Sequence, residues 1–323
     1  MDKSTAPPTP RVTAFAPATV ANLGAGYDIF GLAIEGPGDK VTVSRDDGVG
    51  IVSVEVSGDG GRLPTDPERN AAAAAGQAVL DVLAPDVGVR MEVSKGLPLS
   101  AGLGGSAASA VAGACAVDAL LGGGLDSVAL LRAAIVGELK GSGAAHPDNA
   151  APSLVGGFVL VPSGEPLRIV KIPTPEELVV VVVHPHVEVE TKAARDLLGD
   201  SISLASGVRQ WGNAAGLVAG LFRGDWELIG RSLEDAVAEP LRGPLVPGLA
   251  AAKEAARASG ALGSGLSGSG PSTFALCRGT ETAEAVGAAM VAAFRDTGEV
   301  DSDLFISPVN EAGATVLEGP GSR

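Results

Sequence analysis

The chain has 323 residues, of which 46% are hydrophobic and only 3% aromatic, and its formal net charge is −15. A chain of this length and hydrophobic content can bury a large core and form one large or two medium domains. The strong negative charge, without any basic block interleaved with aromatic residues, argues against a nucleic-acid-binding groove.

The termini and the cysteines carry no signal for export or for a metal site. No apolar run reaches the roughly 18 residues that a membrane span needs, and the first ten residues lack the hydrophobic region of a secretion signal. Cys115 and Cys277 have no partner at metal-ligand spacing. We therefore expect a cytoplasmic protein that binds neither membranes nor nucleic acids, with flexible tails over 1–10 and 318–323.

The first part of the chain is dominated by strand signals, followed by alanine-rich helical segments. Glycine, proline and aspartate turns separate the strands. The predicted elements are strands over 12–15, 29–34, 40–44 and 51–56, a helix over 67–83, a strand over 87–93 and an almost wholly apolar helix over 106–121.

The second part mixes helices and strands. Six consecutive valine or leucine residues within 177–184 predict a central strand that is buried on both faces. Strands first and mixed elements afterwards indicate an α+β fold whose halves meet near residues 155–165. The other predicted elements are helices over 126–140, 190–198, 202–222, 225–235 and 281–296, strands over 157–161, 272–277 and 303–308, and a glycine-rich loop over 141–149.

The most informative segment is Lys95–Ser109, in which a strand runs through a proline- and glycine-rich loop straight into a helix. Gly102, Gly104 and Gly105 allow positive φ, so that consecutive N–H groups can point to one place. The unpaired amides of the helix that follows add the positive end of its dipole. This arrangement predicts a phosphate-binding loop.

Two other phosphate motifs do not fit this loop. The Walker pattern GxxxxGK[ST] is absent, and so is the dinucleotide-binding fingerprint. Glycines before an alanine-rich helix can also serve close packing alone. The hydroxyl of Ser106 favours a phosphate site, because it can either cap the helix or coordinate Mg²⁺.

The sequence resembles the GHMP kinase superfamily through three motifs in the expected order. Residues 98–108, PLSAGLGGSAA, are similar to the second motif, PxxxGLGSSAA, with Gly105 in place of the first serine and Ser106 as the second. Residues 16–28 resemble the first motif and residues 265–272 the third. Three motifs together are far more specific than any one.

Within that superfamily the chain resembles the homoserine kinases over residues 11–310. The segment ANLGAGYDIFGL is similar to their NLGxGFDxxGLA, with Ala25 for the usual proline and Tyr27 for the usual phenylalanine. The segment HPDNAAPSLVGGF at 146–158 is similar to HPDNVAPALLGGF. Two further similar segments lie at 191–195 and 239–248.

The resemblance implies a two-domain kinase. A domain of ribosomal-S5-like topology over 11–157 would carry the ATP site, and a ferredoxin-like domain over 158–310 would close over the substrate. The implied reaction is phosphorylation of the side-chain hydroxyl of L-homoserine by ATP and Mg²⁺, a step toward threonine. Related enzymes are often dimers, so a homodimer is also consistent with the resemblance.

Homoserine is a small zwitterion, so its pocket needs a cation for the carboxylate and polar groups around the ammonium and hydroxyl. By resemblance, Arg195 and Arg242 would bind the carboxylate. The residues expected around the ammonium and hydroxyl are Asn22, Asp28, Asp148 and Asn149. The alternative is that the arginines are surface residues, Asp28 a turn residue and Asn22 a loop stabiliser. Asp28 would orient the substrate, with proton acceptance as a second role.

The resemblance also implies nucleotide and metal ligands. Ser106 and Glu138 would hold Mg²⁺, which needs only one or two protein oxygens besides phosphates and waters. For Glu138 the alternative is a solvated carboxylate at a helix end, and for Thr191 it is a helix N-cap. The residues predicted to bind nucleotide are Pro98, Leu99, Ser100, Ala101, Gly102, Leu103, Gly104, Gly105, Ser106, Ala107, Ser109, Thr191 and Gly268.

Other chemistry-bearing residues are given structural roles. His146, His184 and His186 have no zinc-ligand spacing, and are expected to be structural or to lie beside the substrate. Trp211 and Phe222 share one face of a predicted helix, which indicates core or interface rather than a cofactor contact.

Two competing functions remain open at this stage. One is a GHMP kinase for another small alcohol, such as mevalonate, shikimate or a modified amino acid. The other is a non-catalytic nucleotide-binding member of the family, for which the only support is Gly105 in the second motif. An assay of ADP release over amino acids and polyols separates homoserine kinase from another GHMP kinase. Calorimetry with a non-hydrolysable ATP analogue and homoserine, showing that both bind while turnover is absent, would favour the non-catalytic member.

Overall fold

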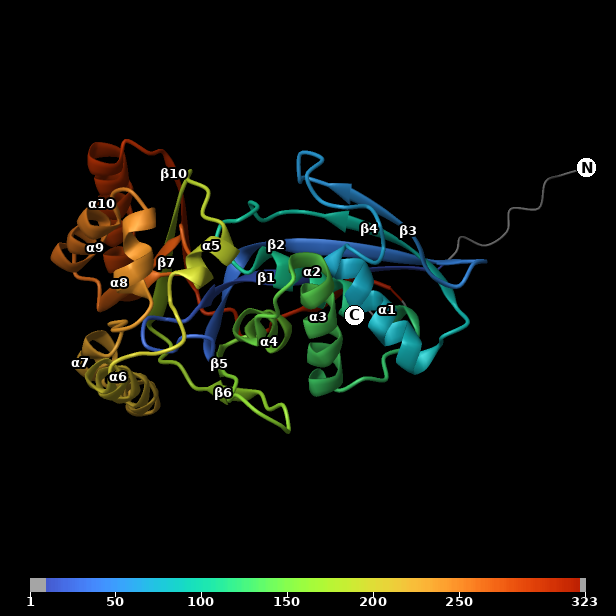
Figure 1. Ribbon diagram of the computed structural model, residues 1–323, viewed down its shortest axis with the longest axis horizontal. Helices are drawn as coiled ribbons and strands as arrows, with labels where there is room; N and C mark the ends of the chain where they lie inside the picture. The colour runs from blue at the N-terminus through green and yellow to red at the C-terminus, as the bar shows by residue number, and fades with distance from the viewer. Residues whose placement is uncertain (1–9, 320–323) are drawn as a thin grey trace, which may run out of the picture.

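The structure is a computed structural model that describes residues 10–319, apart from the side chain of Ser142. Its strands form two sheets with helices packed against them, which confirms the predicted α+β class. Figure 1 shows α1 to α4 along one side of the long strands β1 and β2, while β7, β10 and the helices α8 to α10 gather at the other end of the molecule.

Within residues 10–319, the first sheet has seven strands in the order β11-β1-β2-β4-β3, with β5 pairing to β2 and β6 to β5. All neighbours are antiparallel except β3 and β4. Its strands are β1 (Arg11–Ala21), β2 (Phe30–Asp46), β3 (Gly50–Ser57), β4 (Gly88–Ser94), β5 (Phe158–Leu160), β6 (Val170–Ile172) and β11 (Thr315–Glu318). The helices of this half are α1 (Ala71–Leu83), α2 (Gly105–Leu120), α3 (Ser127–Ser142) and α4 (Pro147–Val155).

In the described part of the chain, the second sheet has four antiparallel strands in the order β10-β7-β9-β8. They are β7 (Leu178–Pro185), β8 (Gly263–Leu266), β9 (Thr273–Arg278) and β10 (Ser302–Pro308). The helical elements here are α5 (Thr191–Asp196), α6 (Leu204–Arg223), α7 (Trp226–Arg231), α8 (Glu239–Arg242), the 3-10 turn η1 (Gly243–Leu245), α9 (Leu249–Ala258) and α10 (Thr280–Gly298).

Strand β7 explains the run of valines in the sequence. Val180 and Val182 pack into the larger core, which also holds α2 and the first sheet. Val181 and Val183 point to the other face and pack with α9 and α10 in a second core. Every residue of β7 is buried, as predicted for a strand that is covered on both faces.

The chain passes from the first sheet to the second between β6 and β7, and β11 returns to the first sheet. Glu318 pairs with Thr13 in β1, so its prediction as part of a flexible tail is wrong. Of the other residues predicted as tails, Pro10 and Gly319 are described, and residues 1–9 and 320–323 lie outside the described part of the chain. The division into domains at 157/158 stays a proposal.

Several local predictions are also corrected. The segments 29–34 and 40–44 form one strand, β2, and the predicted loop over 141–149 contains the start of α4, with Pro147 in its first turn. The helix expected over 225–235 ends at Arg231. The predicted elements include none of β6, β8, β11, α4, α8 or α9.

The aromatic pair on α6 is not in the core. Trp211 is 61% exposed and Phe222 62% exposed, so core packing is wrong for both and an interface stays a prediction. Over the described part of the chain, no helix is both long enough and apolar enough to cross a membrane.

Candidate active site

One cavity of about 900 Å³ is lined by residues from both halves of the chain. It brings together every residue that the sequence predicted to bind substrate, nucleotide or metal, except Leu103. The side chain of Leu103 is only 1% exposed and belongs to the core, while its carbonyl accepts a hydrogen bond from the Thr19 amide at 3.1 Å. Leu103 therefore packs into the core behind the loop and does not line the cavity.

The glycine-rich loop has the backbone geometry that the sequence predicts. Ser100, Gly102 and Gly104 have φ of 56°, 73° and 68°. Gly104 is the left-handed N-cap of α2, and a Cβ there would come within 2.1 Å of Thr19 Oγ1, so glycine is required. The first amides of α2 have no carbonyl acceptor within the helix and lie at the cavity wall. This part of the site suits an anion.

The third motif presses against this loop. Ser267 Oγ donates to the Gly102 carbonyl at 2.6 Å, and the Ser272 amide donates to Ala101 at 3.2 Å. A Cβ on Gly102 would lie 2.7 Å from the carbonyl oxygen of Gly270, so this close contact depends on glycine. The second half of the chain thereby fixes the glycine-rich loop of the first.

Ser106 and Glu138 occupy the wall of the cavity beside the loop. Gly104 is the N-cap of α2 and no side chain caps it, so the capping role considered for Ser106 is wrong. The Ser106 Oγ is buried and has no hydrogen-bond partner. Glu138 is 1% exposed, which rules out a solvated carboxylate, and it accepts a hydrogen bond from the His146 amide at 3.0 Å. Burial, followed by the nearby charge of Asp148, raises the pKa of Glu138 well above its usual range.

These two side chains fit a hard divalent cation. An oxygen without a partner is available on Ser106, and a cation would favour the ionised form of the buried Glu138 carboxyl. Among the described residues, no cluster of three or more His, Cys, Asp and Glu side chains could hold a metal. A cation here would therefore need further oxygen ligands from phosphates and water.

Asp148 is the second buried acid of the site. It is 2% exposed, and its Oδ1 has no hydrogen-bond partner. Burial, followed by the charge of Asp28, raises the pKa of Asp148 to about 7. A ligand cation would offset both effects, so Asp148 is suited to bind an ammonium group.

Asn22 and Asp28 form a strained corner of the cavity, with φ of 70° and 57°. Asn22 Oδ1 accepts from the Asp28 amide at 3.1 Å, and its Nδ2 donates to the Gly268 carbonyl at 3.0 Å. Asp28 forms an ion pair with Arg195 at 2.9 Å. Arg195 therefore already has an anionic partner, which the sequence did not indicate.

Arg242 is 4% exposed, so it is not the surface residue of the alternative interpretation. Its guanidinium donates to the carbonyls of Ala194 at 3.0 Å and Gly268 at 3.2 Å, and lies 5.2 Å from the centre of the Tyr27 ring. It forms no ion pair with any carboxylate in residues 10–319. A buried cation that meets only neutral groups is a strong candidate to bind a carboxylate.

The remaining predicted residues lie nearby. Thr191 is the first residue of α5, whose N-cap is Glu190, so Thr191 is not a cap; its Oγ1 lies 3.4 Å from Ser269 Oγ. Asn149 Oδ1 accepts from Thr19 Oγ1 at 2.8 Å. His146 lines the cavity, and burial lowers its pKa.

His184 and His186 lie outside this cavity, in a smaller one of about 500 Å³. His184 contacts Ser272 Oγ at 3.2 Å, and His186 contacts Asp303 at 3.1 Å. Both contacts agree with structural roles.

The cavity is locally more cationic than the chain as a whole. Its carboxylates are Asp28, Glu138, Asp148 and Glu188, and its cationic side chains are Arg62, Arg69, Lys95, Lys192, Arg195 and Arg242. The net charge of −15 thus does not prevent anion binding at this place. Arg62, Arg69, Lys95 and Lys192 are not among the predicted site residues, although Lys95 directly precedes the glycine-rich loop.

Comparison with known proteins agrees with the fold and the motifs. The family "GHMP kinases N terminal domain" matches residues 70–157, and "GHMP kinases C terminal" matches residues 217–296. Mevalonate kinase of L. major has a TM-score of 0.70 at 19% identity, over 95% of this chain and 98% of that one, which shows a shared fold.

Homoserine kinases are more similar. The enzyme of Chloroherpeton thalassium is 44% identical over 95% of this chain and 99% of its own, and that of Xanthomonas campestris is 41% identical over 94% and 93%. The crystal structure of homoserine kinase from Cytophaga hutchinsonii has a TM-score of 0.91 at 44% identity, over 98% of this chain and 100% of that one. Identity at this level over nearly the whole chain shows that the protein belongs to the homoserine kinase family of GHMP kinases.

Proposed function

We propose that the protein transfers the γ-phosphoryl group of ATP to the side-chain hydroxyl of L-homoserine, giving ADP and O-phospho-L-homoserine. Membership of the GHMP kinases implies ATP as the donor. The choice of acceptor depends on one observation: the cavity beside the phosphate loop contains both a buried guanidinium (Arg242) and a buried carboxyl (Asp148). The two groups match the two charges of an amino acid.

The phosphate loop supplies positioning and electrostatic stabilisation. Amides at the start of α2 would bind the β- and γ-phosphate oxygens. Ser106 and Glu138 would hold Mg²⁺, which, when bound, neutralises charge on the phosphates. Because phosphoryl transfer passes through a loose transition state, alignment and charge stabilisation supply most of the catalysis.

The acceptor side would orient the hydroxyl for in-line attack. Arg242 would bind the carboxylate, and Asp148 the ammonium. Asn22 and Asp28 would contact the hydroxyl, whose proton Asp28 can accept as the new P–O bond forms and the bond to ADP breaks. Arg195 would join the carboxylate contact only if its ion pair with Asp28 opens or is shared.

A panel of acceptors tests the proposed function. ADP release with Mg-ATP is measured with L-homoserine, L-serine, L-threonine, mevalonate and shikimate. We expect turnover that depends on homoserine and exceeds that of every other acceptor. Activity with mevalonate or shikimate alone would favour another kinase of the superfamily. Binding of both ATP analogue and homoserine without turnover would favour a non-catalytic role.

The substitution Ser106→Ala tests the metal site. Loss of this oxygen is expected to lower kcat about tenfold, equivalent to about 1.4 kcal/mol, and to raise the concentration of Mg²⁺ needed for half-maximal rate. The measurement is a titration of rate against Mg²⁺ at saturating ATP and homoserine. Ser94→Ala, at an exposed position on β4, is the matched control. An unchanged Mg²⁺ dependence contradicts the assignment.

A further inference from the structure

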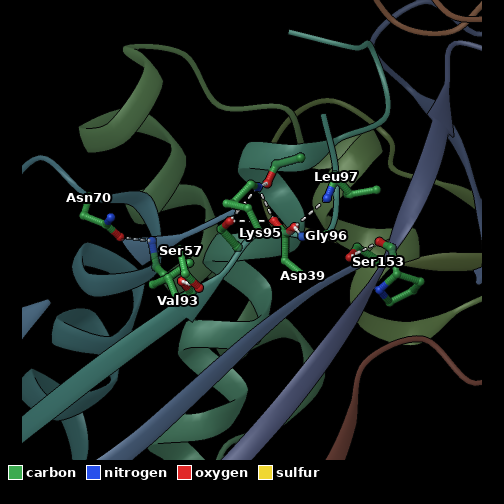
Figure 2. Close-up of polar contacts among 12 residues, drawn as sticks. Asp39, Ser57, Asn70, Val93, Lys95, Gly96, Leu97 and Ser153 are labelled. Carbon is green, nitrogen blue, oxygen red and sulfur yellow. Dashed lines mark hydrogen bonds and ion pairs between the residues drawn. The ribbon is translucent and has the colours of Figure 1, made fainter. Parts of the chain in front are cut away.

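A buried ion pair joins β2 to the residue that precedes the phosphate loop, next to the first turn of α2. Lys95 and Asp39 form it, with side chains that are 2% and 0% exposed (Figure 2). Among the ion pairs of residues 10–319, no other has both side chains fully buried; the pair of Lys253 and Glu239 comes nearest, at 31% and 13%. Lys95 lines the cavity, but neither Lys95 nor Asp39 is among the substrate, nucleotide or metal ligands named above.

Asp39 holds the start of the loop. Its Oδ1 accepts hydrogen bonds from the amides of Gly96 at 3.0 Å and Leu97 at 3.2 Å. Figure 2 shows Asp39 facing both residues. A Cβ on Gly96 would come within 2.1 Å of the carbonyl oxygen of Gly38, so the β2 backbone touches the loop at this point. The start of the loop is therefore fixed to β2 by close packing and by a charged acceptor.

Lys95 holds the end of the loop. Its ammonium donates to the carbonyl of Gly105, the first residue of α2, at 2.8 Å, and to Ser109 Oγ at 3.0 Å. Ser109 Oγ donates in turn to Asp39 Oδ2 at 2.7 Å. With Asp39 as its third partner, the ammonium has used its three donors. Lys95 is thus not placed to donate to a phosphate, although it lines the cavity.

We propose that Lys95, Asp39 and Ser109 are positioning residues, which hold the two ends of the phosphate loop together so that its amides converge on the nucleotide. A buried ion pair contributes little net stability compared with apolar residues of similar size, because desolvation offsets its attraction. An effect of the ion pair on the loop can therefore be measured separately from an effect on the stability of the fold. The inference rests on the proposed function only in taking residues 96–107 to bind nucleotide phosphates.

The test compares nucleotide affinity with acceptor affinity in the double variant Lys95→Met/Asp39→Asn, which leaves no unpaired buried charge. The dissociation constant of a non-hydrolysable ATP analogue is measured by calorimetry without acceptor, and the KM for homoserine at saturating ATP. We expect nucleotide binding to weaken about tenfold and the homoserine KM to change less than twofold, because the charges act on the loop alone. Ser109→Ala, which keeps the ion pair, should weaken nucleotide binding about threefold.

The matched control is Arg132→Met/Glu165→Gln, which removes an exposed pair whose side chains are 51% and 71% exposed. This control should change neither the dissociation constant of the ATP analogue nor the KM for homoserine. If the Lys95→Met/Asp39→Asn variant is folded and binds nucleotide within twofold of the unchanged protein, the positioning role is wrong. A parallel rise in both constants also overturns it. Since the calorimetry involves no acceptor, a failure of the homoserine assignment removes only the KM measurement, and the nucleotide affinity still decides the positioning role. If the double variant does not fold, Ser109→Ala decides by the same two measurements.

Discussion

Replacing Arg242 by alanine is expected to raise the KM for homoserine about 10- to 100-fold, because charge-assisted hydrogen bonds contribute about 1.5 to 3 kcal/mol. The guanidinium is buried, and in the described part of the chain it donates to the carbonyls of Ala194 and Gly268 and to the Tyr27 hydroxyl, and lies beside the Tyr27 ring. A carboxylate of the substrate would be its first anionic partner. The KM for ATP should change far less, since the phosphate loop contacts other residues.

The measurement is a pair of KM determinations, each at saturating co-substrate. Arg242→Lys should retain part of the homoserine affinity, because lysine keeps the charge but cannot form two parallel hydrogen bonds. Arg257→Ala is the control, since Arg257 is exposed and forms an ion pair with Glu254, three residues earlier on α9. Thermal unfolding checks that the loss of the contacts with Ala194 and Gly268 leaves the fold intact. Equal increases in both KM values would falsify the carboxylate role.

The substitution Asp148→Asn should have an effect of similar size, again on homoserine. In the unliganded protein the pKa of Asp148 is raised to about 7, so the carboxyl is neutral below that pH and charged above it. Only the charged form pairs with an ammonium. The homoserine KM of the unchanged protein is therefore expected to fall as the pH rises through about 7. In the variant it should be about 10- to 100-fold higher at pH 8, by loss of a charged contact, and nearly independent of pH.

The same substitution should stabilise the protein without ligand. A carboxyl whose pKa is raised on folding stabilises the folded state at acidic pH, and this stability is lost as the pH rises from the usual value of 3.8 to about 7. The neutral amide of Asp148→Asn would carry no such penalty. The free energy of unfolding of the variant at pH 8 should therefore exceed that of the unchanged protein by a few kcal/mol, and the two should be nearly equal at pH 4. Urea unfolding at both pH values measures the difference. The assigned pKa is wrong if the free energy of unfolding gained by the variant over the unchanged protein is smaller at pH 8 than at pH 4.

Much of the fold follows from local sequence patterns. Asp126 is the N-cap of α3, where the Ala129 amide donates to its Oδ1 at 2.8 Å, a position at which aspartate is strongly favoured. The valine run of β7 and the apolar helix α2 are where the sequence analysis expects them. Each of these features depends on neighbours within a few turns or residues, so the sequence alone suffices to predict it.

The elements that were not predicted fall into two groups, those with a signal in the sequence and those that depend on tertiary contacts. Gly248 before the alanine-rich stretch of α9, and Pro147 in the first turn of α4, are helix-start signals that were present in the sequence. The strand β11 has no such signal, because a short exposed strand forms only where another strand offers its edge. The exposure of Trp211 likewise depends on what packs against α6, which its helical spacing does not reveal.

For the site, the sequence is enough to predict the glycine-rich loop and the residue types around it, because backbone geometry of this kind needs glycine at particular positions. The charge states and the partners of these residues follow from the folded structure. Arg195 pairs with Asp28 across 167 positions, and Lys95 with Asp39 across 56. Burial, not sequence position, raises the pKa values of Glu138 and Asp148. Desolvation and charge contacts depend on distances between residues that are remote in the chain, and those distances exist only once the chain has folded.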